Sequence, residues 1–557
     1  MMRLRIARGT IALPVICGAV VVLSILIAAG LARASTYVVY IPLNSSIYQE
    51  LDTLDGLGWL DTYLAGIKPI SRVEAARLTL EAEHNLTASE NADALAETMI
   101  HVLREQLHDE IGWLEHDAED DQPNTIHPIQ QLEATYLYTR GQRRYMNQNT
   151  GSEINAEEAT PLFPNNDGIP TSAGSNEIAT GSAWAGLGGF LTAYGEGALA
   201  GPMTRDPVNT NRAQFVLGEG VVSLGNAAIS FGQEEMWWGT GHFAALSQSN
   251  NAKAFDALRV QGIHPTLLPG FLRYLGPFRG EVFFGQLDHG REFSRPWIAG
   301  QNVNFKPLPT FEFGFTHAIM FGGRDNDHYG FSGFIGRATG FNTGSASSGN
   351  TNSRGGIYLK FRFPSLRDVQ VYQEILGEDN LTNEVPGVGR FLPFLAVSYQ
   401  GGVYVPRLTA DGLTNLRFEY AILEPNYSTH SDSLYWTYDN QLMGDPMGPN
   451  ASEIDLALGR WLWQRYLVDV DGFYTERAAK FGVPGLHKER SGGVAFDLLR
   501  LAQKMPKLRD ALGEIRARAA VEYVKSINYA PDNNSLRFTL VLTGALTPAL
   551  PNLTWNW

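Results

Sequence analysis

The side chains best suited to chemistry in this 557-residue chain gather in one short cluster, from Glu235 to Asn251. Indole rings stack on the apolar C–H faces of sugars, and amide groups bind neighbouring hydroxyls. The cluster therefore predicts a glycan-binding surface. Besides a Gly-x-Gly turn, its candidate contacts are Trp237, Trp238, His242, Asn250 and Asn251.

A second set of candidate glycan contacts follows in the sequence: Asp288, Arg291, Arg295 and Trp297. Other interpretations of both sets stay open at this point. Tryptophan pairs are common in the aromatic girdles of membrane barrels. Glycine and asparagine are common in turns, and Asp288 and Arg291 could simply pair with each other.

Enzyme chemistry has weaker support in the sequence. Neighbouring carboxylates occur at Glu234-Glu235 and at Asp469-Val-Asp471, but their spacing does not define a glycosidase pair. G-x-S-x-G is absent, and the chain's one cysteine, Cys17, lies in its N-terminal apolar run. We therefore expect a non-catalytic protein without cofactor or metal site.

The first 34 residues resemble a secretory signal. Arg3, Arg5 and Arg8 precede an uncharged run, and Ala32-Arg33-Ala34 matches a cleavage site, so the mature chain is expected to begin at Ser35. An uncleaved anchor is the alternative, because the run is long enough to span a bilayer. Cleavage would remove four arginines and take the net charge from −15 to −19, which does not favour nucleic acid as a partner.

Residues 35–125 are expected to form a helical region. Ser71-Arg-Val-Glu74 has the spacing of a capping box, in which the serine and the glutamate each satisfy a first-turn N–H. Two apolar stripes at helical spacing follow, one from Ala75 to Leu86 and one from Leu95 to Ile111. A small bundle explains these patterns.

From residue 126 to residue 557 the apolar period changes from helical to alternating. For example, Ile515 and Val521 share one parity, whereas Arg516, Arg518 and Glu522 share the other. Charged residues on one face and aromatic or aliphatic residues on the other fit a transmembrane barrel with a wet lumen. The length allows roughly 16–20 strands, and a large secreted β protein is the alternative.

Three segments are less regular. Asn165–Ala183 and Asn342–Gly356 are rich in glycine, serine and asparagine and are expected to be loops. Glu424–Ser452 is expected to be an ordered loop that projects from the barrel rim or folds inward. Leu498–Leu512 fits either a short helix or a bent strand.

Several blocks together resemble the Wzi family of capsule-assembly proteins. They include Pro69–Leu78, Trp237–Ala252, Leu275–Phe278 with Phe284–Asp288, and Asn304–Gly323. Thr240 and His242 depart from the family pattern, which usually has proline and an aromatic residue there. The resemblance implies an eighteen-stranded outer-membrane barrel, a helical bundle at its periplasmic mouth, and attachment of polysaccharide to the cell surface.

The expected partners follow from this assignment. They are a surface polysaccharide, outer-membrane lipid, and the barrel-assembly machinery, which would engage the aromatic C-terminal strand ending in Trp557. A porin or solute channel is the alternative function, because an inward face rich in arginine, lysine and glutamate fits both. The N-terminal helices favour attachment, since general porins begin their barrel soon after the signal.

Overall fold

The computed structural model describes residues 36–89, 92–115, 122–142, 144, 164–169, 171, 173–202, 212–289, 294–324, 351–378, 383–385, 389–391, 397–425, 427–428, 434–439, 441–477, 487–549 and 552–555. The expected signal segment, residues 1–34, lies outside this range.

In the part of the N-terminal region that the structure describes there are four helices, as expected: α2 (Ser46–Gly56), α3 (Arg72–Ala88), α4 (Ala94–Gln106) and α5 (His108–Glu115). Ser71 caps α3 by accepting a hydrogen bond from the Glu74 N–H. The Glu74 carboxylate instead contacts Arg77 and His264, so only the serine half of the predicted capping box is seen. Within the described residues, no helix is both long and apolar enough to span a bilayer.

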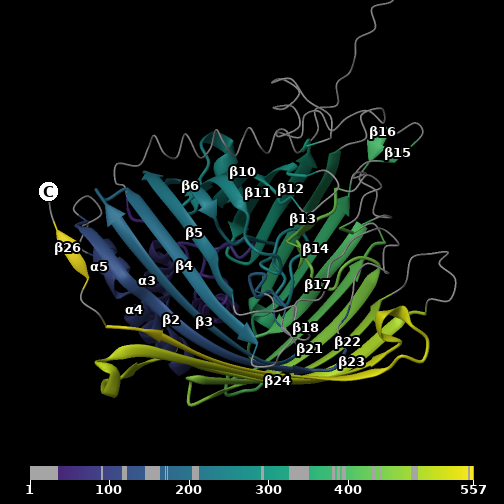
Figure 1. Cartoon of the computed structure of the whole chain (residues 1–557). Helices are drawn as coiled ribbons and strands as arrows, with labels where there is room; N and C mark the ends of the chain where they lie inside the picture. The colour runs from purple at the N-terminus through teal and green to yellow at the C-terminus, as the bar shows by residue number, and fades with distance from the viewer. Residues whose placement is uncertain are drawn as a thin grey trace, which may run out of the picture.

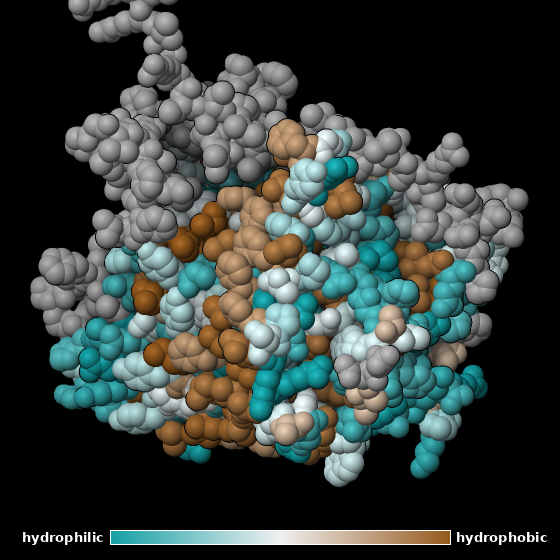
Figure 2. Space-filling view, turned by 180° about the vertical axis from the view of Figure 1, so that it is seen from behind, coloured by the Kyte–Doolittle hydropathy of each residue, from teal (hydrophilic) through white to brown (hydrophobic). Residues whose placement is uncertain are grey.

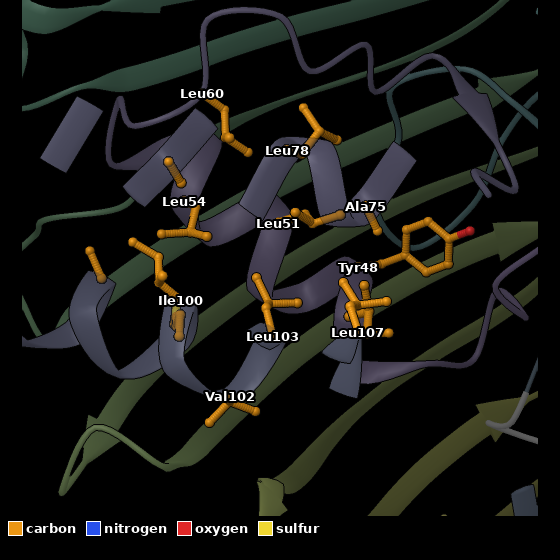
Figure 3. Packing of buried hydrophobic residues seen from close by; sticks show 14 of the residues in the cluster. Tyr48, Leu51, Leu54, Leu60, Ala75, Leu78, Ile100, Val102, Leu103 and Leu107 are labelled. Atoms are coloured by element: carbon orange, nitrogen blue, oxygen red, sulfur yellow. The ribbon is translucent and has the colours of Figure 1, made fainter. Parts of the chain in front are cut away.

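The four helices share one apolar core, which Figure 3 shows from close by. Leu51, Leu78 and Leu103, from α2, α3 and α4, are each completely buried. The same core includes Trp461 and Leu501 of the barrel wall. The bundle and the barrel wall therefore bury apolar surface against each other. Burial of each large apolar side chain stabilises this contact by roughly 1.5–3 kcal/mol.

Eighteen antiparallel strands close into one barrel, which confirms the predicted fold class. Each strand pairs with the next along the ring, and β25 pairs with β2 to close it (Figure 1). The strands are β2 (Asn124–Arg140), β3 (Gly174–Leu187), β4 (Leu191–Pro202), β5 (Arg212–Leu224), β6 (Ala227–Gln233), β8 (Asp256–Gly262), β10 (Pro277–Gln286), β11 (Trp297–Leu308), β12 (Phe311–Phe321), β13 (Thr351–Phe363), β14 (Val369–Glu378), β17 (Val397–Val405), β18 (Thr414–Leu423), β21 (Ala451–Leu462), β22 (Tyr466–Arg477), β23 (Glu489–Met505), β24 (Ala511–Lys525) and β25 (Ser535–Thr547).

Short strands and 3-10 turns lie between or beside the eighteen strands of the barrel. β9 (Thr266–Leu267) pairs with β10, and β26 (Leu553–Trp555) pairs with the start of β2. Three two-stranded ribbons stand apart from the barrel wall: β1 (Ile67–Lys68) with β7 (Trp237–Trp238), β15 (Asn383–Val385) with β16 (Gly389–Phe391), and β19 (Thr437–Tyr438) with β20 (Gln441–Leu442). The 3-10 turns are η2 (Gly270–Leu275), η3 (Pro364–Leu366), η4 (Pro506–Leu508) and η5 (Ile527–Tyr529).

The two faces of the wall follow the predicted alternation. On β24, Val521 and Tyr523 are exposed on the outer face, whereas Arg516, Arg518 and Glu522 line the interior. Apolar side chains gather in a band through the middle of the face seen in Figure 2, with hydrophilic residues on both sides of it. In a closed sheet every backbone N–H and C=O group that faces lipid can be hydrogen-bonded to a neighbouring strand. With its apolar exterior, this is therefore a barrel of the outer-membrane type.

Two sequence expectations need correction. Gly174–Ala183 belongs to β3 and Thr351–Gly356 belongs to β13, although both were expected to be loops. Pairing with long neighbouring strands outweighs the low strand propensity of glycine, serine and asparagine. The undecided segment Leu498–Leu512 forms a hairpin, in which β23 and β24 are joined through η4.

The two ends of the barrel differ in their connections. Short turns at residues 188–190, 225–226, 309–310, 364–368, 463–465 and 506–510 lie at one end. Longer connections, such as residues 287–296 and 424–450, lie at the other. The helices lie at the short-turn end, behind β2 to β4 in the view of Figure 1.

Candidate functional site

The predicted polar and aromatic cluster lies inside the barrel. Residues 234–255, called the inward loop below, leave the wall after β6 and rejoin it at β8. Within this loop β7 pairs with β1 of the N-terminal region, and the Gly239 N–H donates to the Gly66 carbonyl at 3.1 Å. The loop and the bundle are therefore bonded to each other across the lumen.

Both tryptophans of the cluster are buried, and this decides between their two interpretations. Trp238 has no exposed surface, and its Nε1 donates to the Glu281 carboxylate of β10 at 2.6 Å. Its ring also packs against Phe283, with centroids 5.3 Å apart. Trp237 keeps only 7% of its surface. The membrane-girdle interpretation is wrong for this pair, because pairing with β1 holds both residues inside the barrel.

Two glutamates of the wall hold the tip of the inward loop through its main chain. The Glu374 carboxylate accepts hydrogen bonds from the N–H groups of Gly241, at 2.7 Å, and Leu246, at 3.3 Å. The Glu419 carboxylate accepts from the N–H groups of His242, at 2.7 Å, and Phe243, at 3.1 Å. The path of the tip is thus fixed by its backbone, and the His242 and Phe243 side chains remain available.

The glycines of the cluster permit this close approach. Gly239 has a φ of 140°, and a Cβ there would lie 2.2 Å from a Glu374 oxygen. A Cβ on Gly241 would lie 2.2 Å from the Ala244 carbonyl oxygen. Both glycines therefore serve the conformation of the loop rather than contact with a ligand.

The two asparagines at the end of the cluster also bond within the protein. Asn250 is 4% exposed, and its Nδ2 donates to the Asn165 carbonyl at 3.1 Å and the Asp167 carboxylate at 2.9 Å. Asn251 Nδ2 donates to the Leu442 carbonyl at 3.0 Å. Asn250 therefore connects residues 165–167 to the inward loop, whereas Asn251 also borders an open space.

That space is a cavity of about 540 Å³ between the inward loop, helix α2 and the wall formed by β2 to β4 and β21 to β25. Among the predicted site residues, His242 and Asn251 line it. Ser46 and Gln49 of α2 and Phe243 of the inward loop also line it. Of the eight predicted residues that the structure describes, two thus lie together at one cavity.

Charged groups dominate the far wall of the cavity. Arg518 of β24 bridges Asp497 at 2.6 Å and Asp471 at 3.3 Å, and Arg516 contacts Glu133 of β2. Further carboxylates border the cavity: Asp167, Glu196, Glu453, Asp455, Asp469 and Glu522. The wall therefore offers donors and acceptors in mixed pairs, as a polyhydroxylated ligand requires.

Two rings add apolar surface to this polar wall. Phe243 comes from the inward loop and Phe473 comes from β22, and both line the cavity. The sequence cluster did not include Phe473, Arg518 or Asp497. The alternating pattern of β22, β23 and β24 could have identified them, because it alone predicts that these side chains face the lumen.

The second predicted set lies elsewhere. The Asp288 carboxylate accepts a hydrogen bond from the Asp439 N–H at 3.2 Å, and Arg295 is exposed and donates to His289 at 2.9 Å. Trp297 stacks on Phe284 on the outer face of the wall, with centroids 5.0 Å apart. These residues do not border the cavity, and Arg291 lies outside the described residues.

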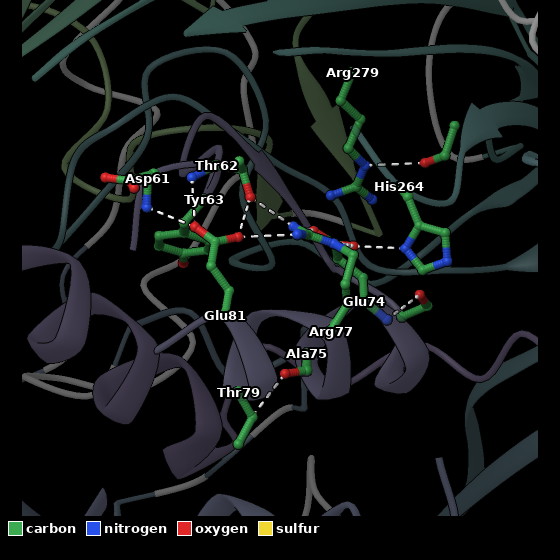
Figure 4. A network of polar contacts seen from close by, with 12 residues as sticks. Asp61, Thr62, Tyr63, Glu74, Ala75, Arg77, Thr79, Glu81, His264 and Arg279 are labelled. Carbon is green, nitrogen blue, oxygen red and sulfur yellow. Dashed lines mark hydrogen bonds and ion pairs between the residues drawn. The ribbon is translucent and has the colours of Figure 1, made fainter. Parts of the chain in front are cut away.

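The N-terminal region is also bound to the wall near β8 and β10, away from the residues that line this cavity. His264, in the connection between β8 and β10, lies 2.6 Å from the Glu74 carboxylate of α3 (Figure 4). Arg279 of β10 donates to the main-chain carbonyls of Ile67 and Pro69, at 3.2 and 3.0 Å. Among the described residues, no group of histidine, cysteine, aspartate and glutamate side chains is arranged to hold a metal ion.

Comparisons with known proteins agree with this architecture. The model of the capsule assembly protein Wzi family matches residues 143–535. A 55.8 kDa protein in the cps region of Klebsiella pneumoniae is 26% identical over 176 residues, which cover 31% of this chain and 34% of that protein. The chain thus matches about a third of that relative's length.

Two solved structures resemble the chain to different degrees. Wzi of Escherichia coli, described as an outer membrane protein involved in group 1 capsule assembly and a carbohydrate-binding β-barrel, superimposes with a TM-score of 0.61 at 17% identity. That match covers 90% of this chain and 98% of Wzi, and it shows a shared fold. The outer membrane protein OprD of Pseudomonas aeruginosa reaches a TM-score of only 0.43 at 8% identity, covering 77% and 96%.

Proposed function

The chain belongs to the Wzi family of capsule assembly proteins, and on that premise we propose that it binds a surface polysaccharide and holds it at the outer membrane without cleaving it. The observation that carries the proposal is the cavity of about 540 Å³, whose wall combines paired charges, amides and two phenyl rings. Sugars need this combination, because their hydroxyls take bidentate hydrogen bonds and their C–H faces stack on rings.

Within this proposal the residues that line the cavity and the residues that hold the inward loop have different roles. His242, Asn251, Phe243 and Phe473 offer side chains to the saccharide at the cavity. Trp238 and Asn250 are positioning residues, since their side chains bond to Glu281 and Asp167 and keep the inward loop in place.

The proposal includes an orientation in the membrane. Barrels of this type have short periplasmic turns and longer extracellular loops, so the short-turn end and the bundle would face the periplasm. The apolar outer face would contact lipid. The C-terminal strand β26, which pairs with the start of β2, would be the element that the barrel-assembly machinery meets.

An open channel, the alternative function, is not favoured by the packing of the lumen. The Asp55 carboxylate of α2 contacts Lys306 at 3.1 Å and Lys360 at 2.7 Å, so the bundle is tied to two strands by buried ion pairs. The inward loop is tied to the opposite wall through Glu374 and Glu419. Both elements occupy space that a porin would leave to water.

The test is a binding measurement on purified protein in detergent. Purified bacterial capsular and exopolysaccharides serve as probes, and their length and reducing ends are followed in the same samples. We expect at least one polysaccharide to bind and none to be shortened. New reducing ends, or no binding across acidic, neutral and amino-sugar polymers, would contradict the proposal.

Two matched pairs of variants test whether the cavity is the site. Phe473→Ala and Arg518→Gln alter the cavity, whereas Phe496→Ala and Arg490→Gln remove similar groups from exposed positions outside it. Loss of a stacking ring or a charged hydrogen bond should weaken binding by about 1–2 kcal/mol, or roughly fivefold to thirtyfold. Equal affinities for the cavity variants and their controls would place the saccharide elsewhere.

A further inference from the structure

One connection at the short-turn end folds onto the outside of the barrel. Residues 266–276, called the outer segment below, join β8 to β10 and contain β9 and η2. Their Leu268, Leu272 and Leu275 pack in one cluster with Phe278, Val303 and Phe305. Those wall residues alternate with Arg279, Asn302, Asn304 and Lys306, whose side chains bond inside the barrel, so the cluster lies on the outer face.

The outer segment covers wall residues that would otherwise face the membrane. Phe278 and Val303 are each 3% exposed, whereas Leu536, on the outer face of β25, is 66% exposed. Gly276, with a φ of 75°, allows the chain to return, because a Cβ there would lie 2.0 Å from the Lys306 carbonyl oxygen. The wall is therefore two layers thick in this sector.

The second side of the outer segment is also apolar. A 3-10 turn has three residues per turn, so Leu272 and Leu275 share one face and Phe271 and Tyr274 share another. Phe271 is 79% exposed and Tyr274 is 74% exposed. Both large rings thus project from the barrel on the side where its neighbours in a membrane would be.

A basic group accompanies these rings. Arg273 is exposed, and its guanidinium lies 5.1 Å from the Tyr274 ring centroid and 3.2 Å from its hydroxyl. Among the described residues, Arg273 forms no ion pair. Aromatic rings beside an arginine match the boundary of a bilayer, where rings lie among the upper acyl chains and the guanidinium meets phosphate.

We propose that the outer segment is embedded in the phospholipid leaflet at the short-turn end of the barrel, with Phe271 and Tyr274 among the acyl chains and Arg273 at the lipid phosphates. The exposed rings contact the bilayer rather than a protein, because the segment continues the apolar outer face of a closed barrel and carries a cation that complements phosphate. The assignment is independent of polysaccharide binding.

Site-specific labelling of the full chain tests this assignment. Cys17 is the only cysteine, so a Cys17→Ser background gives single sites. Phe271→Cys and Ala410→Cys carry an environment-sensitive fluorophore in nanodiscs of phosphatidylethanolamine and phosphatidylglycerol. Ala410 is the matched control, since it is exposed in the polar turn between β17 and β18 at the same end. Tyr274→Cys replaces Phe271→Cys if that variant does not fold.

The emission of the label at residue 271 should be blue-shifted and should be quenched by phospholipids brominated near the headgroup. The label at residue 410 should instead be quenched by aqueous iodide. Iodide quenching at residue 271 equal to that at residue 410 would overturn the assignment. Burial of residue 271 in native membranes but not in the nanodiscs would also overturn it, in favour of a protein partner.

Discussion

The Asp55 carboxylate of helix α2 lies 3.1 Å from the Lys306 ammonium of strand β11, and both side chains are 4% exposed. Lys360 of β13 and Gln370 of β14 approach the second oxygen of the same carboxylate, at 2.7 and 2.9 Å. One residue of the bundle therefore binds three strands of the wall, β11, β13 and β14. Burial alone would raise the pKa of Asp55, but the two lysines outweigh it and lower that pKa.

Replacing Asp55 by asparagine should detach the bundle more effectively than breaking a surface contact. The change leaves two buried lysines without their anion, which costs on the order of 3–5 kcal/mol. Lys504→Gln, the control, breaks the Lys504–Glu105 pair between β23 and α4, whose lysine is 57% exposed, and should cost at most about 1 kcal/mol. Protease sensitivity of the bundle against urea concentration, measured on inserted barrels, would reveal the difference; equal curves would contradict it.

The stability of the bundle should fall in acid through Glu74. This carboxyl is 2% exposed; burial, the largest influence, raises its pKa, but Arg77 and His264 together lower it from 4.5 to about 2. A lowered pKa stabilises the fold at pH values above the unfolded pKa, and that stabilisation is lost as the pH falls toward the folded pKa.

The expected loss for Glu74 is about 3 kcal/mol between roughly pH 5 and pH 2. Glu74→Gln should be less stable than the wild type at pH 7, and the difference should shrink over this acid range. Urea unfolding of the bundle at several pH values measures it. A difference that stays constant with pH would show that the Glu74 charge does not contribute.

Trp238→Phe should destabilise the inward loop rather than remove a sugar contact. The variant leaves the buried Glu281 carboxylate without its 2.6 Å donor, at a cost of about 1–3 kcal/mol. Trp463→Phe, at a position 76% exposed, should stay within about 0.5 kcal/mol. Hydrogen exchange of the loop amides reports the change. Slow exchange unaffected by Trp238→Phe, together with lost polysaccharide affinity, would instead make Trp238 a direct contact.

Deleting residues 36–115 should leave a barrel that inserts and conducts ions better than the full chain. The bundle core includes Trp461, Leu467 and Leu501 of the wall, so its removal opens the mouth at the short-turn end. Single-channel recording in planar bilayers compares the two forms. Identical conductance in correctly inserted proteins would mean that the helices do not occlude the lumen.

The frame of the protein could be predicted from local patterns. Alternation placed Arg516 and Arg518 inside and Val521 outside, because each strand of a barrel has one wet and one apolar face. The same rule predicts the cavity wall at Asp469 and Phe473. Helical spacing likewise predicted the bundle, although it did not show that Glu74 bonds to His264 instead of its own first turn.

The inward loop could not be predicted in this way, because its bonds join residues far apart in the sequence. A tryptophan pair fits a lipid girdle, a sugar platform or an internal support equally well. Only the pairing of Trp238 with Ile67, and the contact of its indole with Glu281, distinguishes these roles. The sequence did not show that Glu374 lies opposite Gly241.

The hydrogen bonds by which Glu374 and Glu419 hold the main chain of the inward loop have an evolutionary consequence. Glu419 accepts the backbone N–H groups of residues 242 and 243, which any residue except proline supplies, so this hold does not depend on the side chains at these two positions. His242 and Phe243 are thus free to diverge among relatives while the loop keeps its shape. Under the proposed function, single substitutions at this tip would therefore suffice to change the saccharide that is bound and would leave the scaffold intact.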